Sequence, residues 1–264
     1  MNKKILPIGA AVHTRGVKRG EDYGWYVRVG DTPLFDKIED IHRVALRDVE
    51  GNTPRLAVLV EQQHVGFLIG NMQSQRLDHA QRIINDTLYL EFDIDQFMVV
   101  KAAAILLVCS EDDYKKYEHD LTEYAEALYQ KYLEASLSFN ALADIEWPVD
   151  EHLEPIKPAK LALALPINDS TCKQCAGYLV DAANREVSSF CVVSTGRVNL
   201  DKCQQIAKIS DGCIVLTQSS EVGQEIVLKK KLTQRQKLNK RLSTPLRKVL
   251  IRLSQCSNES ISIL

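Results

Sequence analysis

The chain has 264 residues, of which 45% are hydrophobic and 26% charged, with a formal net charge of −2. These values are ordinary for a folded globular protein and exclude wholesale disorder. The seven cysteines are an odd number scattered through apolar stretches, which argues against a secreted disulfide framework.

The N-terminus resembles the start of a signal peptide, because two lysines precede an apolar run. That run is short and meets Pro7 and Gly9, so we expect a first strand instead. No apolar stretch reaches the ~20 residues of a transmembrane helix. We therefore expect no transmembrane segment and a cytoplasmic protein.

Strand patterns dominate the first ~95 residues. Residues 23–29 are aromatic and β-branched, and residues 41–47 alternate in part, so both predict strands. Two apolar runs, 56–60 and 65–69, are separated by a polar tetrapeptide, which predicts a hairpin. Alternation over residues 87–92 predicts a half-buried strand.

Two helices are expected next. Residues 96–109 form a mainly apolar run that predicts a buried helix, and Ser110 is a candidate N-cap for a second helix reaching about Leu142. Apolar residues recur along the second helix at a spacing of three and four. They are Tyr114, Tyr117, Leu121, Tyr124 and Leu128. This seam is expected to pack on the protein's own sheet, and the alternative is a partner helix.

Strands and helices alternate after residue 160. The expected strands are 161–167, 187–194 and 213–217, with intervening helices capped by Ser170 or Thr171 and by Asn199. The sequence therefore predicts an α+β protein in four parts. They are a β-rich domain with two helices (1–145), a proline-containing linker (146–160), a small α/β (βαβαβ) domain (161–228) and a basic amphipathic helical tail (229–264).

The tail carries the strongest physical signal. Residues 1–228 carry 23 basic and 34 acidic side chains, whereas residues 229–252 carry ten basic side chains and no acidic one. Leucines recur there at helical spacing, and Thr244-Pro245 predicts a break between two helices. The basic residues are Lys229, Lys230, Lys231, Arg235, Lys237, Lys240, Arg241, Arg247, Lys248 and Arg252.

Such charges repel one another unless something anionic meets them. The candidates are nucleic acid, an acidic partner protein, an anionic membrane surface and the protein's own acidic body. We expect a non-catalytic adaptor whose basic helices bind an acidic protein or nucleic acid. A homo-oligomer is also compatible with the sequence.

The alternative is an enzyme of an unrecognised type. Its site would lie at the strand-end loops of the α/β domain, around Asp169, Ser194 and Arg197, because ligands of parallel sheets bind at that edge. A second candidate is the polar stretch that contains Arg76, Asp78, His79 and Arg82. An acid–base or metal role there needs another carboxylate, such as Asp86 or Glu91.

Cys172 and Cys175 form a CxxC pair. Zinc binding, a redox role favoured by a lowered thiol pKa at a helix start, and two ordinary helix-face cysteines are the three interpretations. We expect the last one, with no metal and no cofactor. The order of a β-rich front, a charged central helix and a small α/β rear resembles accessory subunits of bacterial antiviral defence systems, and this resemblance implies a similar accessory role.

Overall fold

The computed structural model describes residues 6–46, 55–93, 97–138, 153–158, 162–184 and 189–229. The chain divides into two units, Met1–Lys229 and Lys230–Leu264. The fold described below is that of the first unit. The expected tail lies outside the described residues except for Lys229.

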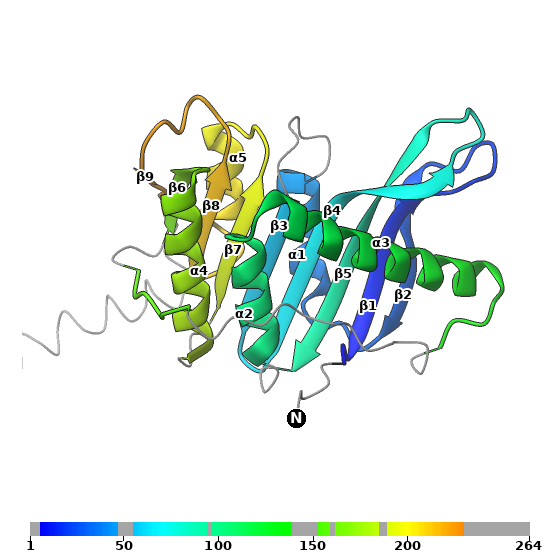
Figure 1. The fold of residues 1–264 in the computed structure, drawn as a ribbon, viewed down its shortest axis with the longest axis horizontal. Coiled ribbons are helices and arrows are strands. Elements are labelled where there is room, and N and C mark those ends of the chain that lie inside the picture. The colour runs from blue at the N-terminus through cyan, green and yellow to red at the C-terminus, as the bar shows by residue number, and fades with distance from the viewer. Residues whose placement is uncertain are drawn as a thin grey trace, which may run out of the picture. The chain divides into compact units, whose positions relative to one another are not determined.

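The first unit is built on one mixed sheet of nine strands in the order β2-β1-β5-β4-β3-β7-β8-β6-β9 (Figure 1). Strands β1 to β5 form an antiparallel half, and β6, β7 and β8 run parallel to one another. The bounds are β1 Gly9–Arg15, β2 Tyr23–Gly30, β3 Arg55–Glu61, β4 His64–Leu77, β5 Ile83–Asp93, β6 Ala162–Pro166, β7 Phe190–Thr195, β8 Gly212–Thr217 and β9 Ile226–Val227.

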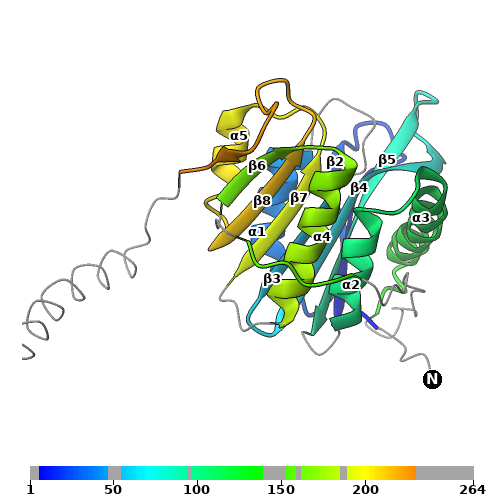
Figure 2. The same ribbon diagram turned by 60° about the vertical axis from the view of Figure 1, so that its left-hand side comes forward.

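Helices cover both faces of this sheet (Figure 2). The described helices are α1 Phe35–Ile41, the π-helix η1 His42–Leu46, α2 Phe97–Leu106, α3 Glu111–Leu133, α4 Asp169–Asn184 and α5 Leu200–Ile206. Helices α2, α3 and α4 pack on one face, and α1, η1 and α5 pack on the other. No helix within the described ranges is long and apolar enough to cross a membrane.

Strand alternation explains the two cores. Val192 of β7 belongs to the core under α2, α3 and α4, whereas Cys191 and Val193 belong to the opposite core. The expectation of a half-buried strand at 87–92 was wrong, because helices on both faces bury the whole segment, including the carboxyl group of Glu91.

The two halves of the chain meet at β3 and β7, which pair antiparallel with Leu56 opposite Ser194 and Val60 opposite Phe190. Strands from both sides of the expected boundary at 146–160 therefore share one sheet. The α+β class is confirmed by this mixed sheet and its helices. The division into separate domains stays a prediction.

The strand expected at 41–47 was wrong. Residues 35–46 are helical, because Ile38, Ile41 and Ala45 follow helical spacing and are all fully buried. The partial alternation at this segment was the weaker of the two patterns.

The helix caps were largely predictable. The N-caps Ser110 and Asn199 are confirmed, since their side chains accept hydrogen bonds from the backbone N–H groups of Asp113 and Lys202. Helix α4 instead starts at Asp169, where the Asn168 side chain accepts from the Thr171 N–H at 3.0 Å.

Candidate functional site

A pocket of about 470 Å³ lies where the carboxyl ends of the parallel strands meet the α2–α3 connection. Its residues are Gly70, Asn71, Leu106, Leu107, Cys109, Ser110, Glu111, Tyr114, Lys115, Glu118, Ile167, Cys172, Ser194 and Gln218. This volume lies in the range of small-molecule sites.

The sheet register explains the position of the pocket. Ser194 of β7 lies opposite Leu216 of β8 and Leu56 of β3, and Leu56 lies opposite Ile69 of β4. Beyond this row β3 has only one more residue, whereas β4 continues through Gly70 and Asn71. The pairing of β4 with β5 shifts register here, and Asn71 adopts a left-handed φ of 63°.

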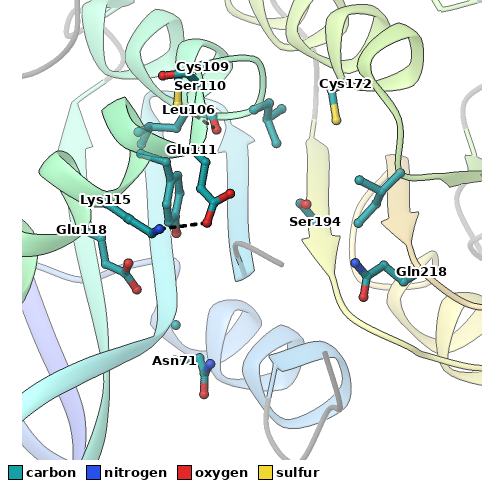
Figure 3. Close-up of a pocket in the computed structure, with 14 residues that line it drawn as sticks. Asn71, Leu106, Cys109, Ser110, Glu111, Lys115, Glu118, Cys172, Ser194 and Gln218 are labelled. Carbon is teal, nitrogen blue, oxygen red and sulfur yellow. Dashed lines mark hydrogen bonds and ion pairs between the residues drawn. The ribbon is translucent and has the colours of Figure 1, made fainter. Parts of the chain in front are cut away.

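Two walls face one another across the pocket (Figure 3). Glu111, Lys115 and Glu118 come from the first two turns of α3. Cys172, Ser194 and Gln218 form the other side and come from α4, β7 and the residue after β8. Asn71 lies at a third side, so the pocket joins both halves of the sheet.

Two largely buried hydroxyl groups line this pocket and have no partner in the part of the chain that the structure describes. Ser194 is only 5% exposed and Tyr114 only 8%. Neither hydroxyl makes a hydrogen bond to another described residue, and neither is completely sealed from solvent. Because a buried hydroxyl without a partner costs free energy, each is available to a ligand in the pocket.

Among the described residues, the charges in the pocket leave the Glu118 carboxylate without an ion pair. Lys115 Nζ lies 2.9 Å from Glu111 Oε1, and both side chains are largely exposed. Glu118 has no ion pair or hydrogen bond through its carboxylate within the described part of the chain. Burial raises the pKa of Glu118, and Lys115 opposes this shift. The α3 wall is therefore acidic.

The thiol groups at this site are protonated. Burial raises the pKa of Cys109 and of Cys172, and it raises that of the fully buried Cys175 further. The redox interpretation of the CxxC pair required a lowered pKa at the start of α4, and the raised values contradict it. Cys172 and Cys175 are both free thiols.

The three residues expected at the strand ends are only partly brought together. Ser194 lines the pocket, whereas Asp169 and Arg197 are not among its lining residues. Asp169 is the first residue of α4, and Arg197 is exposed on the loop after β7. No histidine belongs to the described lining, so Ser194 has no imidazole base beside it there.

The stretch from Arg76 to Arg82 forms the end of the β4–β5 hairpin. Arg76 Nη2 donates to both oxygens of the buried Asp86 at 3.0 Å, and its guanidinium lies 4.3 Å from the Tyr129 ring centroid. Burial raises the pKa of Asp86, against the opposing effect of Arg76.

Asp78 closes the same hairpin and is buried. Its carboxylate accepts from the backbone N–H groups of Ala80 and Arg82, and Arg15 Nη1 lies 3.3 Å away. These N–H donors, and Arg82 first among them, hold the pKa of Asp78 well below its usual range. His79 is exposed at the turn. The hairpin is thus held by ion pairs, and a catalytic role for it stays a prediction.

Of the ten basic tail residues, only Lys229 is described. Its backbone N–H donates to Gln204 Oε1 at 2.8 Å, and its carbonyl accepts from the same side chain. The other nine lie outside the described residues. Within the described ranges, no group of three or more His, Cys, Asp and Glu side chains could hold a metal ion.

Comparisons with protein-family models, with curated proteins and with solved structures find no match to this chain.

Most of the pocket residues were not predicted from the sequence as site residues, and Tyr114, Glu118 and Asn71 are among them. Tyr114 was expected only as part of the core seam of its helix, and Glu118 lies one turn further along the same face. Asn71 follows Gly70 inside a long strand, and a glycine–asparagine pair there signals a bulge. The side-chain pattern of the first 145 residues gave no sign that the start of α3 would border a pocket at the carboxyl ends of the parallel strands.

Proposed function

We propose that this chain is a non-catalytic adaptor, whose acidic body supports a basic tail that binds an acidic partner, either a protein or a nucleic acid. The supporting observation is the segregation of charge. Residues 1–228 have a net charge of −11, and the ten basic residues follow at positions 229–252. The boundary between the two units of the chain, at Lys229 and Lys230, coincides with this change of sign.

Charge segregation of this degree favours association over catalysis. Close like charges raise the free energy of the unbound tail, and an anionic partner removes that cost. With a nucleic acid, binding also releases counterions, so affinity falls steeply with salt.

The test uses duplex DNA and poly-glutamate as labelled probes, in fluorescence anisotropy at 50 and 300 mM salt. The full chain is expected to bind at least one probe at low salt and to lose at least tenfold in affinity at high salt. A chain ending at Lys229 is expected to keep its circular dichroism and thermal transition but to bind neither probe.

A second variant separates charge from folding. Five tail residues, Lys230, Arg235, Lys240, Arg247 and Arg252, are replaced by glutamine in the full chain, which keeps its length. Unchanged binding by this variant contradicts the proposal, and so does aggregation of the chain ending at Lys229, because the tail would then belong to the core.

The second candidate is an enzyme that uses the pocket at the strand ends. It is favoured by the Ser194 hydroxyl, which lies at the carboxyl edge of the parallel strands and has no partner among the described residues. The described lining offers Ser194 no histidine, and no hydrogen bond to a base activates its hydroxyl among the described residues, so the geometry supports binding more directly than turnover. The accessory role in antiviral defence implied by the resemblance stays a prediction.

A further inference from the structure

Ser194 occupies a position in the sheet where the neighbouring side chains are apolar and buried. It shares the sheet face of Val192, and its cross-strand neighbours Leu56 and Leu216 are core residues that are almost completely buried. A valine there would extend this apolar row. The polar side chain instead leaves a hydroxyl that has no partner among the described residues, which is unfavourable unless water or a ligand satisfies it.

Tyr114 and Glu118 add two further groups from the opposite wall. They are four residues apart on α3 and so lie on one face of the helix. The Tyr114 ring is buried and the Glu118 side chain is half-buried, and within the described ranges neither the Tyr114 hydroxyl nor the Glu118 carboxylate has a hydrogen-bond or ion-pair partner. The three groups approach the pocket from two elements that are distant in sequence.

The charge around the pocket selects against anions. The first turn of α3 carries Glu111, Asp112 and Asp113, and α4 begins with Asp169, so acidic side chains occupy both helix starts that would otherwise attract an anion. Lys115, the one lysine among the described lining residues, is already paired with Glu111. Hydroxyl, amide and carboxylate oxygens remain as acceptors.

We propose that this pocket binds a small organic cation, an ammonium or guanidinium compound with a short apolar body. Glu118 holds the positive charge, and the hydroxyls of Ser194 and Tyr114 accept from the N–H groups of the ligand. Leu106, Leu107 and Ile167 pack against the apolar body. This site belongs to the first unit and does not depend on the basic tail.

The test measures binding of agmatine, spermidine and phenethylamine to the full chain by isothermal titration calorimetry. The anionic probes are AMP and phenylacetate. At least one cation is expected to bind with a dissociation constant below about 1 mM and to raise the melting temperature. Glu118→Gln is expected to weaken that binding at least tenfold, whereas Glu123→Gln, an equal charge change on the exposed part of the same helix, leaves it unchanged.

Ser194→Val separates binding from packing. Valine has nearly the shape of serine with an added methyl group and suits the apolar row, so the variant is expected to keep or raise the melting temperature. It is nevertheless expected to weaken cation binding by about 3- to 10-fold, as the loss of one hydrogen bond does. If Ser194 had only a structural role, Ser194→Val would change the stability and leave the affinity for the cation unaltered.

Three results overturn the inference. One is that none of the three cations binds. Another is that Glu118→Gln and Glu123→Gln have equal effects on the affinity. The third is that AMP or phenylacetate binds more tightly than the cations and loses affinity in Ser194→Val, which would place an anion in the same pocket. Anion binding that Ser194→Val does not change belongs to the tail and leaves the cation result to decide.

Discussion

Glu91 is a carboxyl group that the fold buries completely between two layers of helices. Its Oε2 accepts from the Tyr89 hydroxyl and from the backbone N–H of Leu34, while Oε1 lies 3.7 Å from His64 Nδ1. Burial raises the pKa of Glu91 to about 8, and the Leu34 N–H only partly opposes this. The folded protein therefore holds this side chain as a neutral acid at neutral pH.

This shift makes the free energy of unfolding depend on pH. Below about 4.5 the carboxyl is neutral in both states, and between about 4.5 and 8 only the unfolded chain ionises, so stability falls as the pH rises through this window. Glu91→Gln removes the ionisation and is expected to exceed the wild-type stability at pH 9 by on the order of 5 kcal/mol, with the difference closing towards pH 5. Urea unfolding of both proteins at pH 5 and pH 9 measures this difference in stability.

Asp93→Asn is a comparison variant that keeps the Glu91 carboxyl group, because Asp93 lies on the same strand, is 58% exposed and adds only a minor part to the raised pKa of Glu91. Since burial is the largest cause of that raised pKa, the stability of Asp93→Asn is still expected to fall as the pH rises from 5 to 9. A constant difference between Glu91→Gln and the wild type from pH 5 to 9 would contradict the assignment of a buried neutral acid.

Gly9 begins β1 where another backbone segment passes very close. A Cβ atom at this position would lie 2.1 Å from the carbonyl oxygen of Asp31. Gly9→Ala is therefore expected to lower the free energy of unfolding by at least about 2 kcal/mol. At Gly223 an added Cβ meets nothing within 4 Å, so Gly223→Ala is expected to change the free energy of unfolding by less than about 1 kcal/mol. Equal losses in the two variants would show that β1 can shift away from Asp31.

At the scale of elements, α3 is held to the sheet by a narrow apolar face. Leu128 is 1% exposed and belongs to the core beneath this helix, whereas Leu133 at the end of the helix is 46% exposed. Leu128→Ala is expected to cost about 2–5 kcal/mol, and Leu133→Ala to stay within about 0.5 kcal/mol. Chemical denaturation of both variants measures the difference, and similar losses would mean that Leu133 is covered in solution.

The same helix shows which features were readable from the sequence. The spacing of Tyr114, Leu121 and Leu128 predicted the buried face, and Ser110 predicted the start, because both are local patterns. The expected end near Leu142 was too late, since Ala135 adopts a left-handed φ of 52° after the helix ends at Leu133. Glycine or asparagine usually takes this left-handed position after a helix, so an alanine there does not predict the end of the helix.

Long-range pairing was beyond sequence reasoning. Nothing in the apolar run 56–60 predicts that β3 pairs with β7, about 130 residues later, because a strand pattern indicates burial and not the partner strand. Ser194 was recognised from its place at a strand end. Glu118 and Asn71 were not, since their proximity to Ser194 depends on that pairing and on the packing of α3.

At the scale of the whole molecule, the shared sheet predicts how the first unit unfolds. β3 and β7 join the antiparallel and parallel strands through backbone hydrogen bonds, and the core under α2, α3 and α4 runs across this junction. Neither half can therefore lose its structure without exposing apolar surface of the other. We expect β5 and β8 to open together, with the same limiting free energy in native-state hydrogen exchange.

A substitution at the junction tests this coupling. Val192 of β7 lies opposite Val58 of β3 and is 1% exposed, so Val192→Ala is expected to lower the free energy of opening by about 2 kcal/mol in peptides from β5 and β8 alike. Val227→Ala on the edge strand β9, where the side chain is 53% exposed, is expected to leave the free energy of opening unchanged in both β5 and β8. If Val192→Ala weakens protection in β8 and leaves β5 untouched, the halves on either side of residues 146–160 unfold as separate domains despite their common sheet.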